Sequence, residues 1–479
     1  MSIMSDSASM CVSEQEQSIS FVQKPSIEGI WEGKLIVPGT ELRIVCHVTK
    51  KPDGTFIASL DSPDQGVKGI PVEEVIIENR ILCLQVKTIG GFFEGKLDGD
   101  YLMIEGEWKQ SGASFPLTLK KVDSIEEITK PQDPQKPYPY LEEEVIFENK
   151  FAGIKLAGTL TLPDRVDPSP CVILISGSGP QDRNETIAGH RPFLILADYL
   201  TRQGIAVLRF DDRGVGESTG DFSQATSEDF SSDVMAGIEY LKKREEINDQ
   251  KIGLIGHSEG GIIAPMVAVK SSDVAFVVLL AGTGLTGEEI LHLQSELISR
   301  AMGSSEEEIA KNYFFNDQVY SLVKKEENDE VLTEKLLPLF RDYFSELSED
   351  AKNQIGDQEL FIKAQLQSLL SPWFKFFLTY DPKPTLSRVK CPVLALNGEK
   401  DLQVPPKENL SAIKEGLLQG GNTNFLIKEL PGLNHLFQTA QTGSPEEYAK
   451  IEETISAVAL TIISDWILEQ TVGDEQRYQ

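Results

Sequence analysis

The chain has 479 residues, 40% of them hydrophobic, which allows two or three domains and excludes a wholly disordered protein. Its 75 acidic and 45 basic residues give a formal net charge of -30. Most of the surface therefore repels phosphate, and we expect neither nucleic acid nor an anionic membrane as a partner. The five cysteines are widely spaced without a C-x-x-C pair, so nothing indicates a disulfide framework or a zinc site.

Residues 1–25 form a polar tail that lacks the basic start and the apolar core of a signal peptide. No later apolar run approaches the length of a membrane span. We therefore expect a cytoplasmic protein. Export by a route that needs no such signal is left open.

Residues 26–121 contain short segments of alternating hydrophobicity separated by turn residues. This pattern predicts roughly eight antiparallel strands in a small all-β domain, either a barrel or a sandwich. Two segments nearly repeat, GIWEGKL at Gly29–Leu35 and GFFEGKL at Gly91–Leu97. We interpret Trp31 and Trp108 either as core residues or as ligand contacts. Three roles for this domain remain open: shaping a pocket entrance, binding a polymer, or self-association into a homo-oligomer.

A proline-rich polar stretch at residues 122–144 predicts an extended linker. From residue 145 to 479, apolar runs such as CVILISG and KIGLIG alternate with amphipathic segments. Such runs are typical of a mostly parallel sheet with helices on both faces. At about residues 286–386 the pattern changes to helical spacing, with Ser304 and Glu307 placed as a capping box. We interpret this insertion as a helical cap.

Five aromatic residues cluster near the end of this insertion: Trp373, Phe374, Phe376, Phe377 and Tyr380. Two interpretations stay open for them, packing under a lid or an acyl-binding wall in a pocket.

The most informative motif is GHSEG, in which Ser258 lies between Gly256 and Gly260. An apolar strand precedes it and a helical segment follows it, which is the setting of a G-x-S-x-G nucleophile elbow. Glycines are required there because the serine takes a strained conformation and side chains two residues away would collide with the strand and the helix. We predict that Ser258 is a nucleophile.

A serine hydroxyl needs a base, and the base needs an orienting acid. Among the five histidines, His435 follows the last predicted strand, in the loop LPGLNHLFQ, and is the candidate base. Two carboxylates, Glu399 and Asp401, compete in the loop after the preceding strand, and we prefer Asp401. The chain order Ser258, Asp401, His435 is that of the α/β-hydrolase fold.

A tetrahedral oxyanion needs two N–H donors. One is expected from the backbone of Glu259, directly after the nucleophile. The other is expected from the loop SGSGP at residues 176–180, with Ser178 as first choice and Gly179 as second. Another glycine-rich stretch, Asp211–Gly220, lacks the third glycine of a dinucleotide fingerprint, so we interpret it as a structural turn.

Several motifs together resemble the α/β-hydrolase superfamily, and in particular the two-domain bacterial carboxylesterases of the EstD type: SGSGPQDRNE, GHRPFLILADYLTRQGIAVLRFDDRGVGEST, GHSEGG, NGEKDLQVPP and PGLNH. The resemblance extends from about residue 145 onward, and a β-rich N-terminal region also occurs among these relatives. It implies a triad of Ser258, Asp401 and His435 and the hydrolysis of short acyl esters. Many such relatives are exported, whereas this sequence shows no export signal.

The expected function is therefore that of a serine carboxylesterase acting on small-molecule esters through an acyl-enzyme, with no metal and no organic cofactor. Serine aminopeptidase, thioesterase and dienelactone hydrolase activities use the same machinery and remain alternatives. An aminopeptidase would need an acidic recess for the substrate amine, for which Glu259 is the candidate. A non-catalytic binding protein is the remaining alternative.

Overall fold

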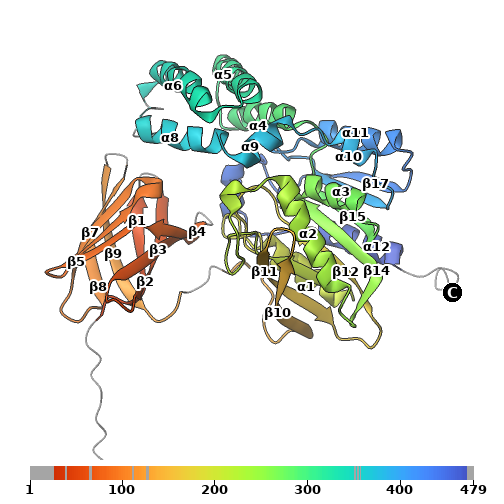
Figure 1. Ribbon diagram of the computed structural model, residues 1–479, viewed down its shortest axis with the longest axis horizontal. Helices are drawn as coiled ribbons and strands as arrows, with labels where there is room; N and C mark the ends of the chain where they lie inside the picture. Colours follow the sequence, from red (N-terminus) through yellow and green to blue (C-terminus); the bar gives the residue numbers. More distant parts are fainter. Residues whose placement is uncertain are drawn as a thin grey trace, which may run out of the picture.

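The computed structural model describes residues 26–471 apart from 38–39, 64–66, 111–112, 126–128 and most of 350–357, where only residues 352 and 355 are described. The polar tail predicted at residues 1–25 lies outside the described residues. Within the described part, the strands form two sheets that are separate along the chain (Figure 1).

The first sheet is antiparallel throughout, with the strand order β4-β3-β2-β1-β9-β8-β7-β6-β5. Its nine strands are β1 (Gly29–Val37), β2 (Thr40–Lys50), β3 (Phe56–Ser62), β4 (Val67–Val72), β5 (Glu74–Glu78), β6 (Ile81–Val86), β7 (Gly91–Leu97), β8 (Met103–Gln110) and β9 (Ala113–Val122). The sheet curls so that β3 contacts β5 and β4 contacts β6, which gives a partly open barrel around one apolar core.

This core forms because buried and exposed side chains alternate along the strands. In β1 and in β7 the aromatic residue of the near-repeat points inward, and Trp31 and Phe93 are both fully buried. The indole N–H of Trp31 donates to the Ile27 carbonyl oxygen at 2.8 Å. The indole N–H of Trp108 donates to the side chain of Gln110 at 3.0 Å. Both tryptophans are thus core residues of the barrel.

The sequence-based strand prediction missed β4. Its sequence, VKGIPV, contains Gly69 and Pro71, which are residues that disfavour a strand. The strand is tolerated because β4 lies at the edge of the sheet with β3 as its neighbour, where proline does not interrupt a second ladder.

The second sheet has eight strands in the order β10-β11-β13-β12-β14-β15-β16-β17. These strands are β10 (Tyr140–Asn149), β11 (Ile154–Pro163), β12 (Ser169–Ile175), β13 (Ala206–Phe210), β14 (Ile247–His257), β15 (Val274–Leu280), β16 (Val393–Gly398) and β17 (Phe425–Leu430). β11 is antiparallel to β10 and to β13, and the neighbours from β13 to β17 are parallel. The sheet begins at Tyr140, five residues before the predicted start of this domain at residue 145. An edge strand accepts charged residues, and the three consecutive glutamates Glu142–Glu144 interrupt the alternation by which a strand is recognised in the sequence.

The α-helices are α1 (Pro192–Arg202), α2 (Ser227–Leu241), α3 (Gly260–Lys270), α4 (Gly287–Ala301), α5 (Glu306–Lys325), α6 (Asp329–Glu346), α8 (Gln358–Leu369), α9 (Pro372–Thr379), α10 (Lys383–Leu386), α11 (Pro406–Gln419) and α12 (Ala457–Thr471). Short 3-10 helices are η2 (Lys87–Ile89), η3 (Phe222–Gln224) and η4 (Pro445–Lys450). Apolar side chains of α2, α3 and α11 pack on one face of the second sheet, and those of α1 and α12 pack on the other. This arrangement confirms the predicted mostly parallel sheet with helices on both faces.

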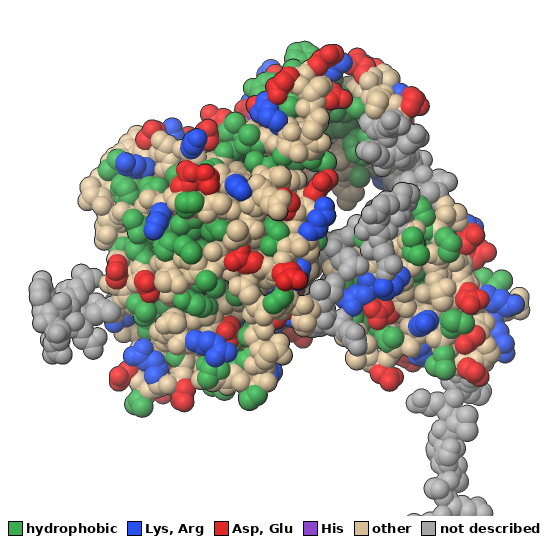
Figure 2. Space-filling view, turned by 180° about the vertical axis from the view of Figure 1, so that it is seen from behind, with side chains coloured by type: hydrophobic (Ala, Val, Ile, Leu, Met, Phe, Trp, Pro, Cys, Tyr) green, Lys and Arg blue, Asp and Glu red, His purple; other side chains and the backbone are tan. Residues whose placement is uncertain are grey.

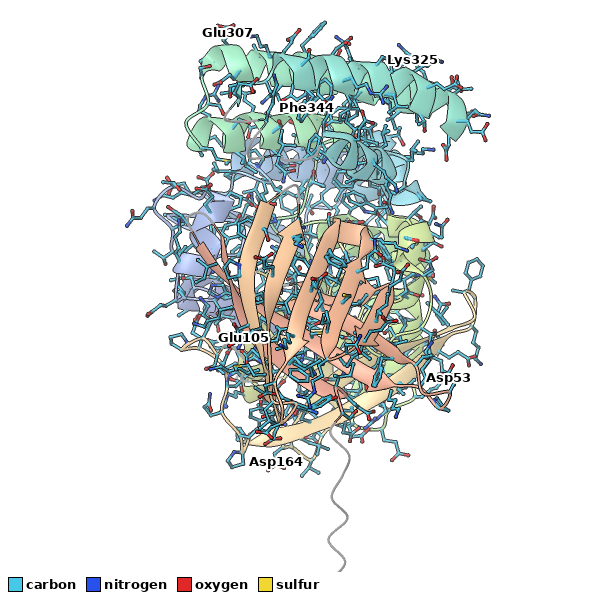
Figure 3. All side chains as sticks on the ribbon, turned by 90° about the vertical axis from the view of Figure 1, so that its left-hand side faces the viewer. Asp53, Glu105, Asp164, Glu307, Lys325 and Phe344 are labelled. Atoms are coloured by element: carbon cyan, nitrogen blue, oxygen red, sulfur yellow. The ribbon has the colours of Figure 1, made fainter. Side chains whose placement is uncertain are left out.

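The helices α4 to α9 lie between β15 and β16 in the chain, within the stretch predicted at residues 286–386, and have an apolar core of their own. Figure 3 shows α5 outermost, with Glu307 and Lys325 near its two ends. The capping box of α5 is formed by Ser305 and Glu308, one residue later than predicted. Two consecutive serines followed by three glutamates allow either register, so the sequence alone does not decide between them.

Among the described residues, no helix is both long enough and apolar enough to cross a membrane. On the face drawn in Figure 2, Lys and Arg side chains are interspersed with Asp and Glu. This face therefore carries charges of both signs side by side.

Candidate active site

Ser258 lies in the sharp turn between β14 and α3, and its backbone is left-handed, with φ of 53°. A Cβ on Gly256 would lie 2.0 Å from the Gly260 carbonyl oxygen, and a Cβ on Gly260 would lie 2.2 Å from the Ile175 carbonyl oxygen. Both contacts are with backbone and cannot be relieved by a rotamer change. The two glycines of the motif are therefore sterically required, as predicted for a nucleophile elbow.

The predicted base and acid meet at the same edge of the sheet. His435 Nδ1 is 2.8 Å from Asp401 Oδ2, and both side chains are buried. The other oxygen of Asp401 accepts the backbone N–H groups of Gln403 and Val404, each at 2.8 Å. The competing carboxylate of Glu399 instead accepts the Gly432 N–H. Of the two candidates, Asp401 is thus the one that contacts the histidine.

Ser258 and His435 line one cavity of about 520 Å³, which we call the serine cavity. Because Asp401 occupies Nδ1 of His435, Nε2 is the nitrogen left for the serine. Among the described residues no hydrogen bond joins Ser258 to His435. Such contacts are often long without substrate and tighten when it binds.

The other three histidines outside the elbow have different surroundings. His47 pairs with Asp61 in the barrel at 2.8 Å. His190 is buried between Thr454 and the Tyr448 carbonyl oxygen, at 2.9 Å from each. His292 stacks on Tyr313 in the helical insertion. None of the three lines the serine cavity.

The loop at residues 176–180 is held by two carboxylates. Asp212 accepts the Ser176 hydroxyl and the Gln181 N–H, each at 2.9 Å. Glu185 accepts the Gly177 N–H at 2.7 Å, so that N–H is occupied. The next residue, Ser178, lines the serine cavity beside Ser258, whereas Gly179 does not. This loop therefore offers Ser178 as the nearer of the two predicted donors.

His257, the residue before the nucleophile, forms a buried pair that the sequence analysis did not predict. Its Nδ1 is 2.9 Å from Glu185 Oε1, and its Nε2 is 3.0 Å from the His435 carbonyl oxygen. Both partners are acceptors, so only the imidazolium form of His257 donates to both. Burial opposes this charge, but the attraction and the hydrogen bond of Glu185, together with the hydrogen bond to the His435 carbonyl oxygen and the charge of Asp401, raise the pKa of His257. The pair joins the loop at residue 177 to the loop that carries His435.

We expect Glu185→Gln to lower the free energy of unfolding by about 3 kcal/mol, because it leaves a buried charge without its partner. The charged or titratable groups that face His257 are Glu185, His435 and Asp401. Since the folded-state pKa of His257 is raised, the pair contributes fully below the unfolded-state value of about 6.5. Its contribution is lost as the pH rises through the folded-state value. Denaturant unfolding at several pH values measures the free energy of unfolding of both proteins. The difference between them should become smaller as the pH rises above about 6.5. A difference that does not change with pH would contradict the charged pair.

The side chain of Glu259 is buried at the wall of the serine cavity, which Glu259 helps to line. Its Oε1 accepts the Ser227 hydroxyl at 2.6 Å and the Trp373 indole N–H at 2.8 Å. Burial raises the pKa of the Glu259 carboxyl, and the hydrogen bonds from Ser227 and Trp373 oppose that rise. The carboxylate thereby connects the elbow to α9 of the helical insertion.

The walls of the serine cavity combine apolar and polar residues, and two carboxylate residues, Glu185 and Glu259, are among those that line it. Trp373 and Phe377 supply aromatic surface, so two of the five clustered aromatic residues line the cavity. On the polar side the amide of Gln403 donates to the Tyr448 hydroxyl at 2.9 Å. Within the described part of the chain, no lysine or arginine lines this cavity.

The described residues contain one group with metal-ligand spacing, formed by Glu288, His292 and Asp317 in α4 and α5. The Lys324 ammonium already pairs with Glu288. None of the three lines the serine cavity, so this group has no part in the chemistry proposed below.

Three comparisons place the chain among known proteins. The family model described as serine aminopeptidase, S33 matches residues 191–356. Esterase EstD of Thermotoga maritima is 26% identical over 313 residues, which are 65% of this chain and 65% of that esterase. The match thus covers slightly less than two thirds of the length of EstD.

A 31.7 kDa protein of Escherichia coli from the traX-finO intergenic region is 24% identical over 256 residues, covering 53% of this chain and 80% of its own. Among solved structures, an esterase of Pyrococcus furiosus, PF2001, has a TM-score of 0.42 at 15% identity, covering 72% of this chain and 98% of that chain. The nucleophile elbow and the mostly parallel sheet are those of an α/β-hydrolase fold, and the chain is similar to an esterase, EstD.

Proposed function

We propose that the protein is a serine carboxylesterase that hydrolyses short acyl esters through Ser258, His435 and Asp401. The observation that carries the proposal is the 2.8 Å contact between His435 Nδ1 and Asp401 at the cavity that Ser258 also lines. The similarity to an esterase of Thermotoga maritima supports the same chemistry.

In the proposed reaction, His435 Nε2 removes the hydroxyl proton of Ser258 while the serine oxygen forms a bond to the ester carbonyl carbon. The imidazolium that forms is stabilised by Asp401. The His435 imidazolium then gives the proton to the alcohol as the bond between the carbonyl carbon and the alcohol oxygen breaks, which leaves the acyl-enzyme. Water attacks the acyl-enzyme by the same steps in reverse, which releases the acid and restores the serine.

The oxyanion of each tetrahedral intermediate is proposed to accept the backbone N–H groups of Glu259 and Ser178, with Gly179 as the alternative second donor. Among the described residues, neither Glu259 nor Ser178 has a backbone N–H bonded to another group, whereas that of Gly177 is occupied. Fixed donors of this kind typically supply about 3 to 4 kcal/mol each to the transition state.

The cavity favours small substrates that carry no negative charge. A volume of about 520 Å³ lies in the lower part of the range for small-molecule sites. The lack of lysine and arginine among the described lining residues disfavours anionic substrates. We propose that the helices α4 to α9 act as a cap, because Trp373 and Phe377 of α9 and Ile290 of α4 supply the apolar wall.

A serine aminopeptidase is the second candidate, favoured by the family model at residues 191–356 and by the buried carboxylate of Glu259. A substrate amine would have to compete with Trp373 and Ser227 for that carboxylate. This competition makes the esterase the better supported of the two.

Turnover of p-nitrophenyl acetate should exceed turnover of aminoacyl p-nitroanilides at equal concentration, because the carboxylate that would hold the amine is already hydrogen-bonded. Release of p-nitrophenol and of p-nitroaniline measures the two activities. Faster cleavage of the anilides would favour the aminopeptidase, and no turnover of any ester would reject the proposed function.

A further inference from the structure

A second cavity lies next to the serine cavity, between η3, α6, α8 and α9. It has a volume of about 1020 Å³. Much of its lining is apolar and includes Phe222, Leu337, Ile362, Leu366 and Leu370. We call it the second cavity. The proposed ester chemistry at Ser258 makes no use of it.

Trp373 lines both cavities, so its indole forms part of the wall between them. The donor loop meets the two cavities at successive residues, since Ser178 lines the serine cavity and Gly179 lines the second. The wall therefore stands beside the position proposed for the reacting carbonyl.

Two contacts fix the indole in this position. Its N–H donates to the buried Glu259 carboxylate at 2.8 Å. Its ring stacks on Phe377, with centroids 5.2 Å apart and the planes inclined by 17°. A tryptophan held by both a hydrogen bond and a stacked ring has few alternative rotamers, so the wall is a defined feature of the fold.

We propose that Trp373 is the specificity-determining residue that limits the protein to esters with short substituents, by closing the passage from the serine cavity into the second cavity. The ligand class suited to the second cavity is an unbranched alkyl chain, because much of the lining is apolar and the cavity shares Trp373 with the serine cavity. This inference rests on the proposed esterase function. It adds the residue that sets the length of the substrate.

The test compares wild type with Trp373→Ala on two series of esters. In one series, p-nitrophenyl esters carry acyl chains from acetate to decanoate; in the other, n-alkyl acetates lengthen the alcohol. We expect the ratio of kcat/KM for the octanoyl ester to that for the acetyl ester, or the matching ratio in the alcohol series, to rise at least about tenfold. The series that responds shows which substituent enters the second cavity.

Phe376→Ala is the matched control, because Phe376 belongs to the same helix, stacks on Tyr380 and lines neither cavity. It should leave the ratio unchanged although it removes similar aromatic area. Trp373→Leu is made in parallel and keeps apolar packing on Phe377, so that the length profile is measured even if the alanine variant folds poorly.

In Trp373→Ala, longer esters could be accepted because the two cavities become joined or because the serine cavity alone becomes larger. A double variant, Trp373→Ala with Gln367→Trp, distinguishes these two explanations. Gln367 lines the second cavity, and a tryptophan there should fill it and return the ratio toward wild type. The inference is overturned if the raised kcat/KM ratio persists in the double variant. It is also overturned if the ratio is unchanged in both Trp373→Ala and Trp373→Leu. Either result leaves the esterase proposal intact, whereas a wild type inactive on every ester would reject that proposal itself.

Discussion

Ser258→Ala is expected to lower kcat/KM for p-nitrophenyl acetate by about 10⁴-fold or more, with the fold unchanged. The hydroxyl is the proposed nucleophile, and the turn between β14 and α3 contains only one other residue, Glu259. Alanine keeps the Cβ that the left-handed backbone at this position already tolerates, so the strain is the same in both proteins. Steady-state hydrolysis, with circular dichroism as the check on folding, measures the effect.

The matched control is Ser464→Ala. Ser464 is also buried, but its hydroxyl donates to the Thr461 carbonyl oxygen in α12, away from the cavity. This variant should retain activity close to that of wild type. Full esterase activity in Ser258→Ala would show that the elbow is a structural turn and that the nucleophile lies elsewhere.

Asp401→Asn is expected to reduce kcat by about 10⁴-fold while leaving the fold intact. One oxygen of Asp401 can still accept the N–H groups of Gln403 and Val404 after the change. The amide NH₂ then faces His435 Nδ1, which favours the tautomer that carries its proton on Nε2. That tautomer cannot accept the serine proton. Pre-steady-state measurement of p-nitrophenol release isolates this loss in the acylation step.

Glu399→Gln provides the comparison, because Glu399 is exposed and its carboxylate contacts the Gly432 N–H instead of the histidine. It lies two residues from Asp401 in the same loop. Near-normal activity is expected. A larger loss in Glu399→Gln than in Asp401→Asn would reverse the assignment of the orienting acid.

The positions of the candidate site could be predicted because the fold brings strand ends together. The carboxyl ends of the parallel strands β14 and β16 and of β17 meet at one edge of the sheet, so motifs that follow those strands become neighbours. Ser258, Asp401 and His435 each lie just after such a strand. Their proximity therefore follows from apolar runs and glycine spacing, which are local in the sequence.

Contacts without a local pattern could not be predicted. His257 and Glu185 are 72 residues apart, and Trp373 and Glu259 are 114 apart, with no spacing rule that joins them. The pairing of His257 depends on how the loop that follows β12 folds back over the elbow. A histidine flanking the nucleophile and a glutamate after the glycine loop were visible in sequence, but only as separate residues.

Errors in element boundaries have a similar origin. Strand β4 was missed because an edge position tolerates Pro71, and β10 was started late because its first half contains three consecutive glutamates. The cap of α5 was displaced by one residue because Ser304 and Ser305 offer the same hydroxyl. In each case tertiary context decided between options that local propensity leaves nearly equal.

The central claim is that Ser258 is an activated nucleophile in the serine cavity, and covalent labelling tests it most directly. The wild-type protein is treated with a fluorophosphonate, digested, and mapped by mass spectrometry, alongside Asp401→Asn. We predict one adduct on Ser258, formed much more slowly in Asp401→Asn. An unlabelled Ser258, or an adduct on another residue formed at the same rate in both proteins, would contradict the claim.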